Sequence, residues 1–555
     1  MAYRFRVLAG VIVVSVLAVY FLPVLMRHDV YSYDAAQHIS WMYRFSDPSL
    51  FPNCEMRDYF SNSFAPFGFR WLYSVLARIV DAKIGSELLP FPLAILTVIG
   101  AYSLGRVVTD GNVIGGMASA ALVLFGGLAG LDFNYLNPIA GGLQRSFALP
   151  ILVFGVLGTI RRRPLLTAAM LLASVLFYPP AFLVLALFQV MVSALDVVRR
   201  QTPSWETLWL VLGGIVSVGV LWRSQEQLAA YGPILTLAEM LRMPDFYAGG
   251  VFYTQILFTH KLGYFFNAFL MGVPEVLAWI VGVAVCAWIL RRAIRIEAWL
   301  MLLSGFLLYG LAYAFLFRLY DPGRYPLYCL LLFHLMLVAP VCVALESAIR
   351  ERILTAKQTL WLSKTAHQWT VLAGIAVAVV VASTGLVAYR YHARGGGMTG
   401  DIPDSVYRYL STLPVDACIA GHPMDVNFVP LRSQRCVPLV IDALNVRQRD
   451  FRRKVFDQLG DILDLMYAGN MSEIRTARAQ LNCRIFLVNA NRYTSDYLAS
   501  VKPTDETIAR LRQKALAAPP LLLHPPSGAV LFSDGPISVV DLDRLEDHAE
   551  AVNKR

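Results

Sequence analysis

The residues best suited to acid–base chemistry stand together near the start of the chain, in "HDVYSYDAAQH" (28–38). If a helix begins near Ser32, then Asp34, Gln37 and His38 share one face, because positions i, i+3 and i+4 are neighbours on a helix. A carboxylate beside an imidazole could take a proton from a substrate hydroxyl. The alternative is that Asp34 only caps a short helix at the membrane surface.

The elements that must position these residues are typical of a membrane protein. Apolar residues make up 57% of the 555 and charged residues only 15%, well below the quarter that is usual in soluble proteins. Apolar stretches of about 20 residues, the length that spans a bilayer, recur through the first ~390 residues. The run 7–26 lacks a small-residue cleavage site, which favours a retained anchor over a signal peptide. The predicted fold class is therefore an all-α polytopic membrane bundle.

About eleven transmembrane helices are predicted. They cover 7–26, 87–105, 112–131, 143–160, 164–178, 181–198, 206–222, 272–290, 297–317, 326–346 and 369–389. The run 164–198 is divided in two, because a single helix would be ~52 Å long against a bilayer core of ~30 Å. The prolines of "FYPPAF" mark the break, since proline lacks an amide hydrogen and clashes with the preceding turn.

Arginine and lysine gather in alternate loops of this arrangement. One side carries Arg4, Arg6, Arg106, Arg161, Arg162, Arg163, Arg199, Arg200, Arg291, Arg292, Arg295, Arg350, Arg352, Lys357 and Lys364. The positive-inside rule makes that side cytoplasmic, in a cell (inner or plasma) membrane. The N-terminus is then expected inside, and the long loops 27–86 and 223–271 and everything after 390 outside. The net charge of +10 follows from this topology, and nothing in the sequence indicates nucleic acid as a partner.

Residues 391–555 are predicted to form a small extracytoplasmic α/β domain, separate from the transmembrane domain 1–390. Expected strands and helices alternate here, with strands in "DACIAGHP", "RCVPLVI" and "CRIFLVNA" and helices in "RQRDFRRKVFDQLGDILDLMYAG" and "MSEIRTARAQLN". Cys418 and Cys436 fall in or beside two of these strands, and the sequence leaves open whether they form a disulfide. Cys54 and Cys483 have no evident partner.

Five short motifs are spread over nearly the whole chain: "DAAQH", "LFPN", "GLQRSFALP", "YPP" and "DPGRY". With them the chain resembles a set of bacterial multi-pass proteins related to the GT-C class of membrane glycosyltransferases. In that class the first outer loop carries a catalytic aspartate, often followed by a second acidic residue. Tyr33 and Asp34 fit the pattern, whereas Ala35 stands where the second acid often lies.

The resemblance implies an enzyme that moves a sugar from a polyprenyl-phosphate-linked donor to an acceptor hydroxyl on the outer face. Asp34, assisted by His38, would accept the proton of that hydroxyl as it attacks the anomeric carbon. Inversion is the simpler outcome for a single carboxylate, because retention usually needs a second nucleophilic step. The expected partners are the lipid-linked donor, membrane lipids and a glycan, lipid or protein acceptor.

Such a donor needs cations near the membrane to hold its phosphate. The planar guanidinium fork suits phosphate oxygens, which makes Arg145, Arg324 and Arg318 candidates, with Tyr325 beside them in "DPGRY". Arginine at the end of a helix also simply reaches out to lipid head groups, which is the alternative here.

Further candidates lie in the other outer loops. Gln37, Asp245 and His260 could line an acceptor groove, although isolated polar residues in loops are more often only hydrated. Some members of the class hold a divalent cation on a D-x-D pair, and "DFN" at Asp132 keeps one of its two carboxylates. No cofactor is required by the sequence, and a divalent cation is an option.

Two other functions share these features. A transporter or flippase of lipid-linked saccharides would also need many spans and phosphate-binding arginines, but transporters tend to bury ionisable groups at mid-membrane. The centres of the predicted spans are nearly free of charged residues, which favours chemistry at the outer surface. A catalytically inactive scaffold would explain the missing acid after Asp34. The interpretation that we carry forward is the glycosyltransferase.

Overall fold

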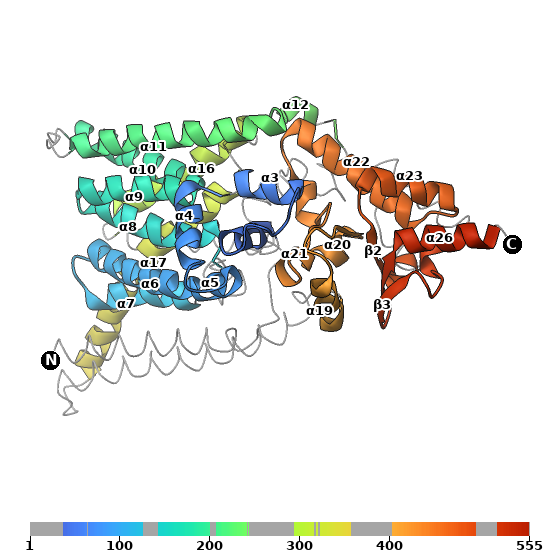
Figure 1. Ribbon diagram of the computed structural model, residues 1–555. Helices are drawn as coiled ribbons and strands as arrows, with labels where there is room; N and C mark the ends of the chain where they lie inside the picture. The colour runs from blue at the N-terminus through green and yellow to red at the C-terminus, as the bar shows by residue number, and fades with distance from the viewer. Residues whose placement is uncertain are drawn as a thin grey trace.

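The structure is a computed structural model that describes residues 37–63, 65–125, 142–199, 207–240, 242–243, 294–315, 318–319, 322–356, 402–494 and 519–553. A bundle of apolar helices occupies one end of the molecule, and the C-terminal region (402–494 and 519–553) occupies the other (Figure 1). The first loop segment (37–88, apart from residue 64) lies between them (Figure 1). The predicted division of the chain at residue 390 falls outside the described residues.

Within the described residues, the bundle contains eight helices in the positions expected from the apolar runs. They are α6 (Pro90–Val108), α7 (Val113–Phe125), α8 (Ala148–Ile160), α9 (Pro164–Phe177), α10 (Pro179–Val198), α11 (Thr207–Leu228), α16 (Ile296–Ala314) and α17 (Arg324–Ala356). Within the described part of the chain, four segments are long and apolar enough to cross a membrane: Ala82–Val108, Pro179–Val198, Ile296–Ala314 and Arg324–Ala348. The other three predicted spans, 7–26, 272–290 and 369–389, lie outside the described residues.

The break predicted within 164–198 is confirmed. The α9 helix ends at Phe177, Tyr178 is extended (φ −151°, ψ 87°), and α10 starts at Pro179. Proline at the first helical position costs no hydrogen bond, because that amide would have no partner within the helix. The paired prolines therefore end one helix and start the next.

Small residues allow close contact between neighbouring bundle helices. A Cβ atom at Gly105 of α6 would collide with the carbonyl oxygen of Gly115 in α7. The Ser119 hydroxyl of α7 donates to the Leu335 carbonyl of α17 over 2.7 Å. Such small-residue contacts are common where helices associate in a membrane, because packing and interhelical hydrogen bonds replace the hydrophobic effect there.

The first loop segment folds into short helices against the end of the bundle: η1 (Ser40–Phe45), α3 (Glu55–Ser63), α4 (Phe67–Leu76) and α5 (Ala82–Leu88). The α4 helix is amphipathic, because Phe69 and Tyr73 are buried while Phe67 and Trp71 are 71% and 58% exposed. An exposed aromatic face suits a helix that lies along a membrane interface.

The C-terminal region is built on a four-stranded sheet of order β1-β2-β4-β3. Its strands are β1 (Ile419–Gly421), β2 (Ile485–Asn489), β3 (Val530–Asp534) and β4 (Ile537–Asp541), with β1 and β2 parallel and the other pairs antiparallel. The helices are α19 (Asp404–Thr412), α20 (Pro423–Val426), α21 (Val429–Arg432), α22 (Arg449–Met466), α23 (Met471–Leu481) and α26 (Leu542–Asn553). Two of the three expected strands and both expected helices are therefore present.

The prediction of a third strand, in "RCVPLVI", is wrong. Only a single bridge, between Cys436 and Cys418, links this segment to the edge of the sheet. Pro438 follows two residues later and has no amide hydrogen to donate, so the segment cannot continue as a ladder.

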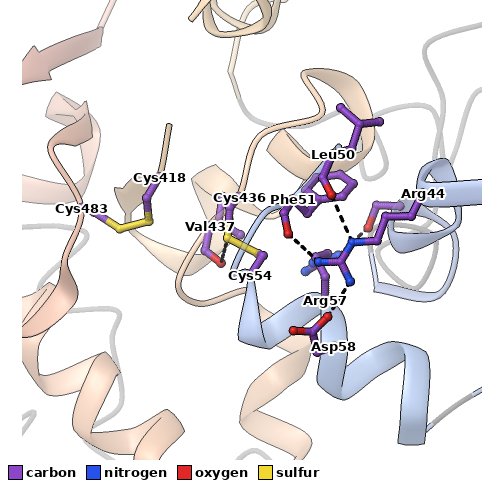
Figure 2. The surroundings of a disulfide bond; sticks show 11 residues. Arg44, Leu50, Phe51, Cys54, Arg57, Asp58, Cys418, Cys436, Val437 and Cys483 are labelled. Carbon is purple, nitrogen blue, oxygen red and sulfur yellow. Dashed lines mark hydrogen bonds and ion pairs between the residues drawn. A yellow bond between two sulfur atoms is a disulfide. The ribbon is translucent and has the colours of Figure 1, made fainter. Parts of the chain in front are cut away.

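Two disulfides hold the C-terminal region, and neither is the pair considered from the sequence. Cys54 is bonded to Cys436, 382 residues away, and Cys418 is bonded to Cys483 (Figure 2). Cys418 and Cys436 do lie on adjacent backbone segments, since the Ile419 amide donates to the Cys436 carbonyl over 2.9 Å. Each sulfur, however, bonds to a cysteine of a different segment, so proximity alone did not identify the partners.

The "LFPN" motif forms the turn that leads into Cys54. Phe51 and Asn53 both have positive φ, 57° and 53°, which is unfavourable for residues with a side chain. Arg44 stabilises this turn, because its guanidinium donates to the Leu50 and Phe51 carbonyls and pairs with Asp58 (Figure 2). These contacts of Arg44 fix the position from which Cys54 forms its disulfide with the C-terminal region.

A buried polar cluster lies where the parallel strands β1 and β2 end. The Asp425 carboxylate is 1% exposed and accepts hydrogen bonds from both Arg492, at 2.7 Å, and Asn489, at 3.2 Å. His422 caps α20, its Nδ1 accepting from the Met424 amide at 3.3 Å. Burial lowers the pKa of His422 to about 4, and the nearby Asp425 carboxylate offsets only part of this effect.

Acid is therefore expected to destabilise the C-terminal region through His422. In the unfolded chain His422 binds a proton below about pH 6.5, whereas in the folded protein it does so only near pH 4. Protonation of His422 therefore does not lower the free energy of unfolding above pH 6.5, and lowers it increasingly as the pH falls below that value. The loss at about pH 5 is roughly 2 kcal/mol. Thermal unfolding of the full chain in detergent at about pH 7.5 and 5 measures it. His422→Asn keeps an atom that can cap α20 and should reduce the pH dependence of the free energy of unfolding. His524→Asn is the control, because His524 is exposed, and it should leave the pH dependence unchanged. Equal pH dependence in all three proteins would contradict the assignment.

Candidate active site at one end of the bundle

A cavity of about 1400 Å³ lies where the bundle, the first loop segment and the C-terminal region meet. Its walls include residues from four of the five motifs found in the sequence. They are His38 of "DAAQH", Leu143, Gln144 and Arg145 of "GLQRSFALP", Tyr178, Pro179 and Pro180 of "YPP", and Arg324 and Tyr325 of "DPGRY". Segments separated by up to about 290 residues thus converge on one site.

The predicted histidine lies in this cavity. His38 Nδ1 is 3.2 Å from the Nε2 atom of Gln144, which belongs to the short helix η5 (Gln144–Phe147) at the start of α8. Because an amide nitrogen can only donate, Nδ1 accepts this bond and Nε2 of the neutral ring carries the hydrogen. Gln37 is buried, 7% exposed, and does not line the cavity. Asp34 lies outside the described residues, four positions before His38.

The three predicted arginines all line the cavity. Arg145 comes from η5, while Arg318 and Arg324 flank the turn that joins α16 to α17. Tyr325 is fully buried, and its hydroxyl donates to the Leu319 carbonyl, which holds this turn in place. The structure thus brings together arginines from two separate connections of the bundle.

Three more arginines, which the sequence did not single out, line the same cavity: Arg70 of α4, Arg223 of α11 and Arg447 of the C-terminal region. Among the lining residues that the structure describes there are six arginines and no aspartate or glutamate. Clustered charge of one sign in a recess surrounded by apolar walls focuses the electric field and attracts ions of the opposite charge. The described lining of the cavity therefore carries more positively than negatively charged side chains.

The rest of the wall is apolar and reaches the surface of the bundle. Phe67 and Trp71 of α4 and Val218 and Trp222 of α11 line the cavity, yet they are 54–73% exposed. Their exposure places them at the mouth of the cavity, on helices that carry apolar outer faces. A charged recess with an apolar opening suits a ligand with an anionic head and a hydrocarbon tail.

The metal prediction finds no support in the described residues, where no group of three or more His, Cys, Asp or Glu side chains is placed to hold an ion. Asp132, the residue considered for a cation, lies outside the described residues, as do Asp245 and His260. A divalent cation accordingly stays a prediction from the sequence.

No protein family model matches the chain, and no curated protein matches its sequence. Its fold is similar to that of ArnT from Cupriavidus metallidurans, solved bound to undecaprenyl phosphate, with a TM-score of 0.51 at 14% identity over 96% of this chain and 98% of ArnT. The oligosaccharyltransferase AglB from Archaeoglobus fulgidus, solved with an inhibitory peptide and a dolichol-phosphate, gives a TM-score of 0.48 at 10% identity over 90% of this chain and 71% of AglB. The full-length likeness to ArnT confirms a GT-C-like, multi-pass membrane fold.

Proposed function

We propose that this protein is a glycosyltransferase that moves a sugar from a polyprenyl-phosphate donor to an acceptor hydroxyl on the outer face of the membrane. The observation that carries the proposal is the convergence of His38, Arg145 and Arg324, from three distant motifs, on one cavity that opens between exposed apolar helices. ArnT, which has the same fold, was solved bound to undecaprenyl phosphate.

The donor would bind with its phosphate deep in the cavity and its chain at the mouth. Arg145, Arg318 and Arg324 would hold the phosphate oxygens, with Tyr325 keeping the α16–α17 turn in shape. The prenyl chain would leave between α4 and α11, past Phe67 and Trp222, toward the lipid. This orientation would bring the sugar, attached to the phosphate, to the side of the cavity lined by His38.

The transfer would follow an inverting displacement. The acceptor oxygen forms a bond to the anomeric carbon as the bond from that carbon to the phosphate oxygen breaks. The hydroxyl proton passes to the carboxylate of Asp34, and the electron pair of the broken bond stays on the lipid phosphate. The arginines stabilise the negative charge that develops on this leaving group. His38, oriented by Gln144, would help to place the acceptor hydroxyl.

Donor binding is expected to depend on the shape of the arginine side chain as well as on its charge. Arg324→Lys keeps the charge but loses the planar fork, so the affinity of the purified full-length protein for undecaprenyl phosphate should fall about tenfold. Arg145→Lys should behave in the same way. Arg78→Lys is the matched control, because Arg78 is an exposed residue of the first loop segment that does not line the cavity.

Two measurements test the proposal together. Calorimetric titration gives the donor-lipid affinities, and mass spectrometry of envelope glycans and lipid-linked sugars, from cells with and without the gene, identifies the product. If Arg324→Lys and Arg145→Lys both bind undecaprenyl phosphate as tightly as the wild type, these arginines do not bind the phosphate. A lipid-linked saccharide that accumulates on one leaflet with no change in any glycan would indicate a transporter instead.

A further inference from the structure

The C-terminal region contributes Gln448 to the wall of the cavity. The backbone around this residue is paired on both sides with the chain that follows α11. The Leu235 amide donates to the Arg447 carbonyl over 2.9 Å, and the Arg449 amide donates to the Pro233 carbonyl over 2.8 Å. These bonds involve only backbone atoms, so they hold residue 448 in the wall whatever its side chain.

The Gln448 side chain has one polar atom that is bound and one that is open. The side chain belongs to a residue that is only 6% exposed and that lines the cavity. Its Oε1 atom accepts a hydrogen bond of 2.6 Å from the Tyr59 hydroxyl of α3. Within the part of the chain that the structure describes, the Nε2 atom has no hydrogen-bond partner. Because an amide nitrogen only donates, Gln448 offers a ligand in the cavity a neutral donor.

A second amide, that of Asn62, lines the same cavity. Asn62 follows Tyr59 by three positions on α3, and its Nδ2 atom donates to the Tyr231 hydroxyl over 3.1 Å. Its Oδ1 atom has no hydrogen-bond partner among the described residues. Asn62 therefore offers a neutral acceptor, where Gln448 offers a donor.

Three packed aromatic rings hold the two amides. Tyr59 stacks on Phe451 of α22 with ring centroids 4.3 Å apart, and Tyr231 meets these two rings edge-on at 4.9 and 5.2 Å. Gly232 permits the close approach, because a Cβ atom there would collide with the Asp450 carboxylate. The two amides are thus oriented before a ligand binds, which lowers the entropic cost of binding.

We infer that Asn62 and Gln448 form a subsite for a sugar ring, which they recognise through its hydroxyl groups and not through charge. A hydroxyl group both donates and accepts hydrogen bonds, so the hydroxyls of one sugar satisfy an open acceptor and an open donor. A few fixed polar groups of this kind give a pocket its specificity. The inference rests on the proposed function and deepens it, because it assigns two residues to sugar recognition.

The proposed reaction brings two sugars to the cavity, the one that the donor carries and the one in a glycan acceptor, and two sets of probes distinguish them. Full-length protein is kept in an amine-oxide detergent, which has no sugar head group. It is titrated with undecaprenyl phosphate and with undecaprenyl phosphates that carry glucose, mannose or arabinose. Protein saturated with undecaprenyl phosphate is then titrated with the neutral trisaccharides maltotriose, mannotriose and arabinotriose.

Gln448→Met removes the open donor and Asn62→Leu removes the open acceptor. Each is expected to weaken binding of at least one sugar probe about tenfold and to leave the affinity for bare undecaprenyl phosphate within about twofold. An effect on a sugar-bearing lipid assigns the subsite to the donor sugar, and an effect on a trisaccharide assigns it to the acceptor. Gln480→Met is the matched control, because Gln480 is exposed on α23 and does not line the cavity, and it should change no affinity.

Gln448→Glu separates the lost donor from a disturbed wall. It keeps an oxygen that accepts from Tyr59 and loses only the open donor. It should therefore weaken the same sugar probe as Gln448→Met. Its added charge acts on bare and sugar-bearing lipids alike, so for the lipids the ratio of the two affinities is compared.

Three outcomes would overturn the inference. The first is that the variants at positions 62 and 448 bind every sugar probe as the wild type does, and the second is that they lose affinity for bare undecaprenyl phosphate to the same extent. The third is that an acetylated and amidated tetra-alanine peptide binds in place of the sugars, which would make this a peptide subsite. Failure of the proposed function gives a different result: if undecaprenyl phosphate does not bind but a trisaccharide binds in a Gln448-dependent way, the donor assignment is wrong and the sugar subsite stands.

Discussion

Asp34→Asn is expected to reduce sugar transfer by about 10²–10⁴-fold, the range typical of losing a positioned general acid or base. The substitution keeps the size of the side chain and removes the group that accepts the proton. Donor binding should stay unchanged, because the arginines that we propose to hold the phosphate are untouched. The expected loss is thus in kcat, with the affinity for undecaprenyl phosphate equal to that of the wild type.

The same substitution separates catalysis from helix capping. Asparagine and aspartate cap helices about equally well, so a purely structural Asp34 would tolerate the change. Asp47→Asn is the matched control: Asp47 lies in the same loop, is exposed, and its carboxylate accepts hydrogen bonds from the Ser49 amide and hydroxyl. If the Asp34→Asn protein transfers sugar as fast as the Asp47→Asn protein, Asp34 is not the general base.

The second large effect concerns the Cys54–Cys436 bond. If a protease site is inserted after Gly397 and cleaved, the two halves of the chain should stay linked on a non-reducing gel and separate when a reductant is added. Cys54→Ala should separate them without reductant. Cys418→Ala/Cys483→Ala should leave them linked, because that disulfide lies within the C-terminal half.

The alternative pairing gives the opposite pattern. A Cys418–Cys436 disulfide would join two residues of the same half, so the cleaved wild type would separate without reductant. Replacing both Cys54 and Cys436 by alanine should also lower stability by about 2–5 kcal/mol, the usual cost of losing a native disulfide. Thermal unfolding of the full-length protein measures this loss.

The sequence alone predicted the helical bundle well, because each membrane helix is a local apolar run. Even the break at Tyr178 could be located, since two prolines have a local effect that does not depend on the rest of the fold. The β3–β4 hairpin was missed, although "SDGP" at its turn is a local signal: Gly535 takes a positive φ of 57° there. Its two strands, Val530–Asp534 and Ile537–Asp541, were not distinguished from loop.

The site was predictable in part. Arg145 and Arg324 were found because they stand at the start of apolar runs within recognisable motifs, and both line the cavity. Arg70 and Arg447 carry no such signal, since one lies on a surface helix and the other in a region predicted to be a separate domain. Only the long-range contacts that dock the C-terminal region against α3 and the segment after α11 bring Arg447 to the cavity.

The distance along the chain between Cys54 and Cys436 has a consequence for biosynthesis. The sequence separation of 382 residues takes about 20 to 80 s to translate at typical rates, and the Cys54 thiol cannot reach its partner during that time. Cys418, which lies next to Cys436 in the folded protein, leaves the ribosome first. A thiol oxidant acting too early would therefore join Cys54 to the wrong cysteine. Correct assembly of this chain accordingly depends on late oxidation or on an isomerase that exchanges disulfides.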